Sequence, residues 1–252
     1  MTRTMPVTVP AGAAQLEGIL ALPITPIGVV LFAHGSGSGR LSPRNNFVAA
    51  ELHAAGIATL LLDLVTVQED AVYQNRFDIA LLCRRLHAAA SWLGTEPLTA
   101  PLALGLFGAS TGAAAALRLA ADSGSGVAAV VSRGGRPDLA GPALAQVDAP
   151  TLLIVGGEDG LVIGMNRQAL DTLRCEKELA IVPGAGHLFE QPGTLEQAAN
   201  LACAWSCGIS RQPDLSNGGA SLTRLQRRVG TPCPRESTPR VGVRRTRRAA
   251  SR

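Results

Sequence analysis

Apolar residues along the first 207 positions follow two patterns that alternate. Short continuous apolar runs, such as IGVVLF at residues 27–32 and IATLLL at 57–62, are typical of strands buried on both faces. Longer segments carry apolar residues at three- and four-residue steps, as in residues 76–93, where Ile79 and Leu82 begin one helical stripe. The first pattern predicts strands at residues 15–22, 27–32, 57–62, 102–107, 127–131, 151–155 and 179–182, and the second predicts helices at 42–55, 76–93, 113–121, 162–173 and 195–205.

Strands that alternate with helices predict an α/β fold, with a mostly parallel sheet and helices on both of its faces. Residues 7–9 and 15–22 are expected to open the chain as a hairpin. Sheets of this kind place their sites outside the carboxyl ends of the strands. The loops that follow strands are therefore where functional residues are sought.

The two ends of the chain differ in charge and composition. Between residues 211 and 252 there are 11 arginines against two acidic residues, whereas the preceding part is mildly acidic. The segment is rich in Arg, Pro, Ser and Gly and has no apolar periodicity, so residues 208–252 are predicted to be a disordered basic tail after a domain at 1–207. An incidental extension is the favoured interpretation, with contact to nucleic acid or an acidic membrane as the alternative.

Cysteine usage and the absence of targeting patterns favour a cytoplasmic protein with reduced thiols. The five cysteines form no close CxxC pair, and no signal peptide or membrane-length apolar run is present. Cys203 and Cys207 share one helix face, where packing is a better explanation than metal binding. Neither a metal site nor a cofactor is predicted.

The first chemical motif is GASTG at residues 108–112, between a predicted strand and an alanine-rich helix. This is the G-x-S-x-G pattern in the strand–turn–helix context that raises a serine above the edge of a sheet. Flanking glycines allow the sharp turn, and the helix N-terminus favours developing negative charge. Ser110 is therefore the candidate nucleophile, with a helix-capping serine as the alternative.

A candidate acid and base follow the later strands. Asp159 and Glu158 come directly after the strand at 151–155, and Asp159 is preferred because a triad acid usually lies a few residues beyond the strand. A turn aspartate that caps the next helix is the alternative. His187 lies in the glycine-rich loop after the strand at 179–182, where it can reach a neighbouring strand end.

The candidates occur in the order Ser110, Asp159, His187, which is the chain order of α/β-hydrolases. A serine hydroxyl is a weak nucleophile at neutral pH, so it needs a base that accepts its proton and an anion that orients the base. Three such residues, each after a predicted strand and in this order, indicate a catalytic triad.

The chain resembles the α/β-hydrolase superfamily and, more closely, the dienelactone hydrolase-like group over residues 7–205. The segments that carry the resemblance are HGSGSGR (34–40), SPRN (42–45), RFDIALL (76–82), GASTG (108–112), GGEDGLV (156–162) and PGAGHLFEQPG (183–193). Dienelactone hydrolase proper has a cysteine nucleophile where this chain has Ser110. The resemblance implies the α/β-hydrolase fold, and no insertion large enough for a lid domain follows the strand at 127–131. Similar proteins also occur fused to a phosphoribosyltransferase domain, but this chain shows no pyrophosphate-binding motif of that domain.

The resemblance also places half of an oxyanion hole in the loop after the strand at 27–32, with the N–H groups of Ser36 and Thr111 as donors. A competing interpretation of this loop is dinucleotide binding, because a glycine-rich loop after one strand and Asp63 at the end of the next strand are both parts of a dinucleotide-binding fingerprint. That fingerprint requires glycine at position 40, where the chain has Arg40.

Arginines at predicted strand ends suggest how a substrate is held. Arg40, Arg133 and Arg136 are candidates for binding a carboxylate or phosphate, since guanidinium groups bind such anions in bidentate fashion. Internal pairing with Asp63, Glu158 or Asp138 is the alternative for each arginine.

These observations together predict a serine hydrolase that cleaves a small ester, thioester or lactone through an acyl-enzyme. A non-catalytic binding module with the same fold is the competing hypothesis. The expected partner is a small-molecule substrate, anionic if the arginines contact it, and neither a specific nucleic acid nor a membrane is expected.

Overall fold

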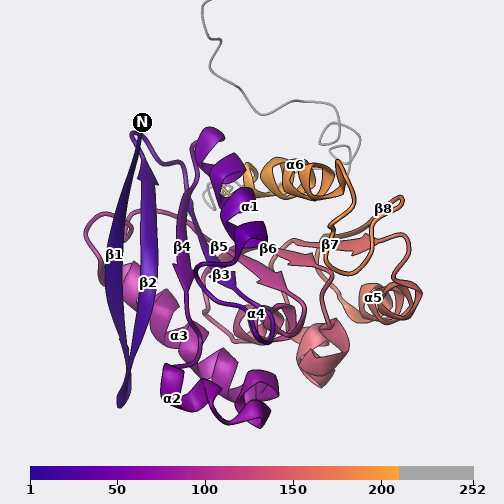
Figure 1. Ribbon diagram of the computed structural model, residues 1–252, viewed down its shortest axis with the longest axis horizontal. Coiled ribbons are helices and arrows are strands. Elements are labelled where there is room, and N and C mark those ends of the chain that lie inside the picture. The colour runs from indigo at the N-terminus through magenta and orange to yellow at the C-terminus, as the bar shows by residue number, and fades with distance from the viewer. Residues whose placement is uncertain (210–252) are drawn as a thin grey trace, which may run out of the picture.

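The computed structural model describes residues 1–209, which form one eight-stranded sheet with helices packed on both faces (Figure 1). Its strand order is β1-β2-β4-β3-β5-β6-β7-β8. The strands are β1 (Thr2–Ala11), β2 (Ala14–Pro23), β3 (Val29–Ala33), β4 (Ala58–Leu62), β5 (Leu104–Ala109), β6 (Val127–Arg133), β7 (Thr151–Gly156) and β8 (Lys177–Val182). The basic tail predicted for residues 208–252 lies, beyond its first two residues, outside the described part of the chain and stays a prediction.

Strands β3 to β8 all run in one direction, and β2 of the opening hairpin is the one strand of the sheet in residues 1–209 that runs against them. β1 pairs antiparallel with β2, and β2 pairs antiparallel with β4. β4, β3, β5, β6, β7 and β8 then follow as parallel neighbours. The mostly parallel sheet predicted from the sequence is confirmed, and the hairpin is longer than its apolar pattern indicated.

Helices cover both faces of the sheet (Figure 1). The α-helices are α1 (Pro43–Ala54), α2 (Val67–Asp70), α3 (Ile79–Thr95), α4 (Thr111–Ala121), α5 (Gly160–Thr172) and α6 (Thr194–Ser206), and the 3₁₀ segments are η1 (Tyr73–Phe77) and η2 (Pro137–Gln146). α1 and α6 pack over a core that includes Phe32 and Phe107. α3 and α4 pack on the opposite face around Leu86 and Leu106. None of the helices within residues 1–209 has the length and apolar character needed to span a bilayer.

The segment between β4 and β5 differs from the sequence prediction. The helix predicted at 76–93 begins only at Ile79, because the Asp78 side chain accepts a hydrogen bond from the Leu81 N–H at 2.9 Å and caps the helix there. Arg76 lies in η1 instead, and α2 before it was not predicted. Between β6 and β7 the chain forms only η2, a short connection where a lid domain would otherwise be inserted.

His34 fixes the loop that leaves β3 toward the sheet edge. Its side chain is buried, and its Nε2 accepts a hydrogen bond from the Leu64 N–H at 2.9 Å. Its Nδ1 lies 2.9 Å from the Gly35 carbonyl oxygen, so this nitrogen carries the proton of the neutral ring. Burial lowers the pKa of His34 and keeps it neutral. The imidazole therefore ties the start of this loop to the chain after β4.

The burial of two leucines predicts that they contribute very differently to the free energy of unfolding. Leu86 on α3 is fully buried, whereas Leu161 on α5 is 81% exposed. Leu86→Ala should lower the free energy of unfolding by about 2–5 kcal/mol, because it removes packed methyl groups and leaves a cavity. Leu161→Ala is the matched control and should change it by less than about 0.5 kcal/mol. Urea unfolding of both variants measures the difference; equal losses would contradict this assignment of the core.

His34 predicts a loss of stability in mild acid. Because burial lowers its pKa in the folded state, the unfolded chain binds a proton first as the pH falls. The stabilisation is complete above about pH 6.5, the ordinary histidine pKa, and is lost as the pH drops from there toward the folded pKa. Urea unfolding between pH 7.5 and 5.5 should show a smaller pH slope for His34→Gln than for the wild type. Burial also lowers the pKa of His53, so the variant His53→Gln is measured in parallel to separate its contribution. A pH slope in His34→Gln equal to that of the wild type would refute the role of His34.

Candidate active site

Ser110 occupies a strained turn between β5 and α4. Its backbone has φ 50° and ψ −123°, a conformation that side chains rarely adopt and that costs on the order of 1–3 kcal/mol. The flanking glycines are required by space, because a Cβ on Gly108 would lie 2.4 Å from the Ala113 Cα and one on Gly112 would lie 2.2 Å from the Ala33 carbonyl oxygen. The GASTG motif therefore brings α4 directly against the sheet and holds Ser110 at the turn.

The Ser110 side chain does not cap the helix that follows. Its hydroxyl makes no capping hydrogen bond to α4, which excludes the helix-cap alternative. The backbone of Ser110 is instead bonded to the loop after β6: its N–H donates to the Arg133 carbonyl at 3.3 Å, and its carbonyl accepts from the Arg136 N–H at 3.0 Å. These bonds fix the turn to the neighbouring strand end and leave the hydroxyl outside the helix-cap network.

Asp159 and His187 form a hydrogen-bonded pair. The His187 Nδ1 lies 2.6 Å from the Asp159 Oδ2, and the two side chains are 39% and 15% exposed. Asp159 makes no capping bond to α5, so the turn-aspartate alternative is also excluded. Of the two carboxylates after β7, Asp159 is therefore the one that contacts the histidine, and Glu158 is not.

Backbone hydrogen bonds bring the two loops of this pair together. The Gly157 N–H donates to the Val182 carbonyl at 2.8 Å, and the Glu158 N–H donates to the Ala185 carbonyl at 2.9 Å. A Cβ on Gly156 would lie only 2.4 Å from the Ala185 carbonyl oxygen, so glycine is needed at this contact. The carboxylate and the imidazole meet because the loops that carry them are joined along their main chains.

The imidazole of His187 lies beside the same loop to which Ser110 is bonded. A Cβ on Gly134 would lie 3.7 Å from the His187 Cε1 and 3.2 Å from the His187 carbonyl oxygen. Gly134 directly follows Arg133, whose carbonyl accepts the Ser110 N–H. The structure therefore places the His187–Asp159 pair beside the loop after β6, to which the Ser110 backbone is bonded, and within residues 1–209 it shows no hydrogen bond between the Ser110 hydroxyl and His187.

The loop after β3 contacts the turn that carries Ser110. A Cβ on Gly35 would lie 2.9 Å from the Ser110 Cβ, so only glycine allows the two segments to approach this closely. The Ser36 N–H, one of the two predicted oxyanion donors, donates to the Thr111 Oγ1 at 3.1 Å. Ser36 and Thr111 are therefore adjacent, and the threonine hydroxyl occupies the Ser36 N–H.

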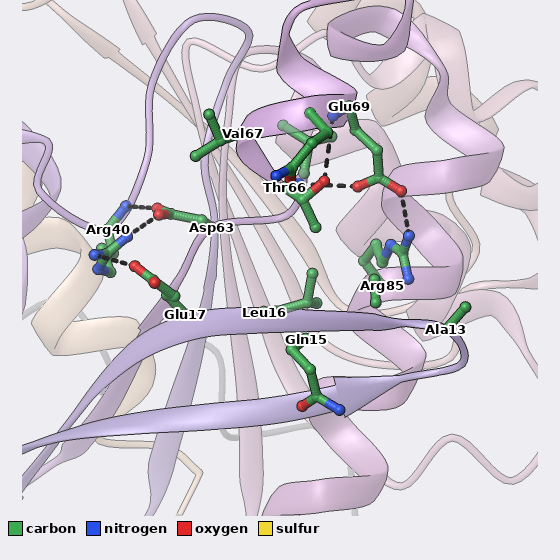
Figure 2. A pocket seen from close by; sticks show the side chains of 13 residues that line it. Ala13, Gln15, Leu16, Glu17, Arg40, Asp63, Thr66, Val67, Glu69 and Arg85 are labelled. Carbon is green, nitrogen blue, oxygen red and sulfur yellow. Dashed lines mark hydrogen bonds and ion pairs between the residues drawn. The ribbon is translucent and has the colours of Figure 1, made fainter.

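A hollow of about 510 Å³ lies along this loop, lined by residues that include Ser36, Arg40 and Arg44. A second hollow of about 600 Å³ adjoins the turn of the β1–β2 hairpin, and the two share Arg40 and Asp63 in their walls. Figure 2 shows this second hollow, where Arg40 points toward Asp63 and Glu17 on one side. Neither hollow is lined by Ser110, Asp159 or His187.

The three arginines proposed for substrate binding differ in their surroundings. Arg40 contacts Asp63 and also pairs with Glu17 at 2.5 Å (Figure 2). Arg136 makes two hydrogen bonds to the Asp138 carboxylate, at 2.9 and 2.7 Å. Both guanidinium groups are engaged by internal partners, which was the alternative expected for them.

Arg133 is the exception, because no carboxylate among the described residues pairs with it. It is 7% exposed at the end of β6, and its Nη2 donates to the Asn45 Oδ1 at 3.3 Å. The buried Nη1 has no hydrogen-bond partner within residues 1–209. Burial, together with the nearby positive charge of Arg44, lowers the pKa of Arg133 to about 10, so the guanidinium remains charged at neutral pH.

Phe189 supports the histidine loop and was not identified from the sequence. It is buried, adopts a left-handed φ of 55°, and its ring centroid lies 5.9 Å from the Arg133 guanidinium carbon. Phe107 contacts the same guanidinium from β5 at 5.8 Å. A phenylalanine in a glycine-rich loop gives no sign in the sequence that it takes this strained conformation, so only coordinates reveal the anchor.

A model of the dienelactone hydrolase family matches residues 53–209. A solved dienelactone hydrolase from Anabaena variabilis is 52% identical and has a TM-score of 0.80, with 82% of this chain and 98% of that chain covered. Est1E from Butyrivibrio proteoclasticus has a TM-score of 0.70 at 12% identity, over 82% of this chain and 99% of that one, and shows the fold alone.

Among curated proteins, a relative from Mycobacterium tuberculosis carries the provisional name phosphoribosyl transferase Rv0571c. It is 56% identical over 199 residues, which are 79% of this chain and 45% of that protein. The chain thus spans about half the length of the curated relatives it matches. The family model matches residues 53–209, and the likeness to the Anabaena structure extends over nearly the whole of that structure. This chain therefore belongs to the dienelactone hydrolase family and has the α/β-hydrolase fold.

Proposed function

We propose that this protein is a serine hydrolase that cleaves a small ester, thioester or lactone through an acyl-enzyme. The observation that carries the proposal is the 2.6 Å hydrogen bond between His187 and Asp159, on loops joined to each other by main-chain bonds beside the strained turn of Ser110. An imidazole oriented by a carboxylate is the base that a serine hydroxyl needs. Family membership supports hydrolysis as the reaction class.

In the proposed reaction the Ser110 hydroxyl attacks the substrate carbonyl while His187 takes its proton. The Asp159 carboxylate holds the proton on Nδ1 of His187, so that Nε2 is free to act as the base, and stabilises the imidazolium that forms. His187 then protonates the leaving group, and water attacks the acyl-enzyme with the same base. The Thr111 N–H, at the first position of α4, has no partner within the helix and serves as one oxyanion donor.

The second oxyanion donor is the Ser36 N–H. Its hydrogen bond to the Thr111 hydroxyl aligns this N–H beside the nucleophile turn before a substrate arrives. When substrate binds, we expect the Ser36 N–H to donate to the substrate oxygen in place of the threonine oxygen, or to donate to both oxygens. The hydroxyl of Thr111 thus positions one donor while its main chain supplies the other.

The substrate class follows from the shape of the site and from the relatives. The connection after β6 holds only η2, so a small acyl group near an open edge is favoured over a long lipid chain. The Anabaena relative is a dienelactone hydrolase, which supports a lactone or a related ester as substrate. Ser110 stands at the position where the resemblance to dienelactone hydrolase proper implies a cysteine, so ordinary esters and thioesters belong to the proposal.

Two other functions compete with this one. A non-catalytic binding module would use the same fold, but it would have no need of a strained serine next to an ordered histidine–aspartate pair. The name of the mycobacterial relative suggests phosphoribosyl transfer, but this chain spans 45% of that protein and the matched part carries the hydrolase fold. We therefore propose hydrolysis for the described residues.

Replacement of Ser110 tests the proposal. Ser110→Ala should lower kcat for p-nitrophenyl esters by about 10⁵–10⁶-fold, because the residues of a triad act as a unit. Labelling by a fluorophosphonate probe should disappear in the same variant, since only an activated serine reacts.

Ser91→Ala provides the matched control, because Ser91 is exposed on α3. This variant should keep both activity and labelling. Wild-type protein that neither turns over a panel of esters, thioesters and lactones nor labels with the probe would favour the binding module. Activity that survives Ser110→Ala would remove Ser110 from the mechanism.

The environment of Arg133 extends the proposal to an anionic group on the substrate. Its buried guanidinium lacks a carboxylate partner, and an unpaired buried charge costs several kcal/mol. Arg44, which lies close enough to lower the pKa of Arg133, is itself paired with Glu190 at 3.3 Å. A carboxylate or phosphate of the substrate, bound beside Ser110, would compensate the charge of Arg133.

Arg133→Met should therefore separate acidic from neutral substrates. For mono-p-nitrophenyl glutarate we expect KM to rise about 10–100-fold, as loss of a charged hydrogen bond predicts, while KM for p-nitrophenyl butyrate stays within about twofold. Arg136→Met is the matched control, since Asp138 already engages that side chain. Equal changes for both esters would show that Arg133 does not recognise the anionic group.

A further inference from the structure

We propose that Cys83, His87 and Asp122 form a binding site for a transition-metal cation, with Zn²⁺ as the best fit. The ligand atoms of the three side chains all lie within 4.8 Å of one another, and this is the only such group among residues 1–209. The inference is independent of the proposed hydrolase function. Asp122 lies at the C-terminal end of α4, a full helix length from Ser110 at its other end, which is roughly 16 Å for 11 residues.

Helix geometry brings the three ligands together. Cys83 and His87 are four residues apart on α3, a spacing that places both on one side of the helix. Asp122 follows the last residue of α4, and α3 and α4 pack against each other on the same face of the sheet. The His87 Nε2 and the Asp122 Oδ2 are in direct contact, so two of the three ligands already converge.

The chemical types of the three ligands indicate which metal ion fits the site. A thiolate, an imidazole and a carboxylate are all ligands of Zn²⁺, at about 2.3 Å for sulfur and 2.0–2.2 Å for nitrogen and oxygen. Tetrahedral bonds of these lengths place ligand atoms roughly 3.3–3.8 Å apart. The present separations, all within 4.8 Å, need only small side-chain rotations to reach that range. Three protein ligands leave the fourth position to water.

Charges of both signs surround the site. Asp122 contributes a carboxylate, and the C-terminus of α4 adds the negative end of the helix dipole. Burial, and then the negative charge of Asp122, raise the pKa of the Cys83 thiol, against the lowering effect of Arg118 and Arg84. The free thiol is therefore protonated at neutral pH, and metal binding must release that proton as the Cys83 sulfur–metal bond forms.

The expected consequence is structural. His87 and Asp122 are 45% and 53% exposed, so a cation reaches them from solvent, while Cys83 is half-buried against the core of α3 and α4. A bound ion would join the middle of α3 to the end of α4, the helix whose other end holds the nucleophile turn. Because the ion binds the folded chain, it should raise the unfolding temperature without entering the acyl-transfer reaction.

Cobalt(II) provides a direct test, because a thiolate bound to Co²⁺ gives an intense ligand-to-metal charge-transfer band in the near ultraviolet. Titration of the reduced full-length chain should give this band with one equivalent of Co²⁺, and Zn²⁺ should displace it. Cys83→Ser should abolish the band, and His87→Gln and Asp122→Asn should weaken binding at least tenfold. Cys175→Ser and Cys233→Ser are controls that should keep it.

Thermal unfolding supplies a second readout on the same proteins. Zn²⁺ at about 100 times its Kd should raise the Tm of the wild type by about 5–10 °C and leave Cys83→Ser unchanged. Acidification should weaken binding, because protons compete for the thiolate and the imidazole.

Two outcomes would overturn the proposal. One is a wild-type chain that shows no charge-transfer band and no Tm shift, while His87→Gln lowers its metal-free stability; the cluster would then be an ion pair only. The other is a band that persists in Cys83→Ser and disappears in Cys233→Ser, which would assign the thiolate to another part of the chain.

Discussion

The close contact between α4 and the sheet is the constraint on which the rest of this structure depends. At Gly108 and Gly112 a single added carbon would lie within 2.4 Å of backbone atoms in α4 or β3. The alanines at the start of α4, which are fully buried, allow the helix to approach this closely. Ser110 must then take a positive φ, and the loops after β3 and β6 are held by direct contact with its turn.

The sequence was sufficient to predict the strands, the packed helices and the residues that meet at the sheet edge. Apolar runs mark buried strands reliably because both faces of a parallel sheet are covered, and residues after such strands must meet at one edge. Ser110, Asp159 and His187 could be proposed as candidates on this ground, together with the G-x-S-x-G motif and the order of the three residues along the chain. The start of α3 was predicted three residues too early, because apolar periodicity does not register the capping side chain of Asp78.

Side-chain partners could not be predicted in the same way. Arg40, Arg133 and Arg136 look alike in the sequence, each near a strand end, yet two are held by carboxylates and one is buried without any. The difference depends on which residues of other elements face each guanidinium. The partner of His87 shows the same limit, since Asp122 lies 35 residues away on a different helix.

The surroundings of Arg133 connect stability with the chemistry proposed for the site. A charged side chain buried against Phe107 and Phe189 lowers the stability of the folded chain, and Phe189 itself holds a strained backbone two residues after His187. Both costs fall on one small region beside the turn that carries Ser110, whereas the core on the α3–α4 face of the sheet is built from buried aliphatic residues. Strain and unpaired charge concentrated in one region are expected where a protein binds a reacting molecule. A ligand that compensates the charge stabilises the folded chain and so offsets their cost.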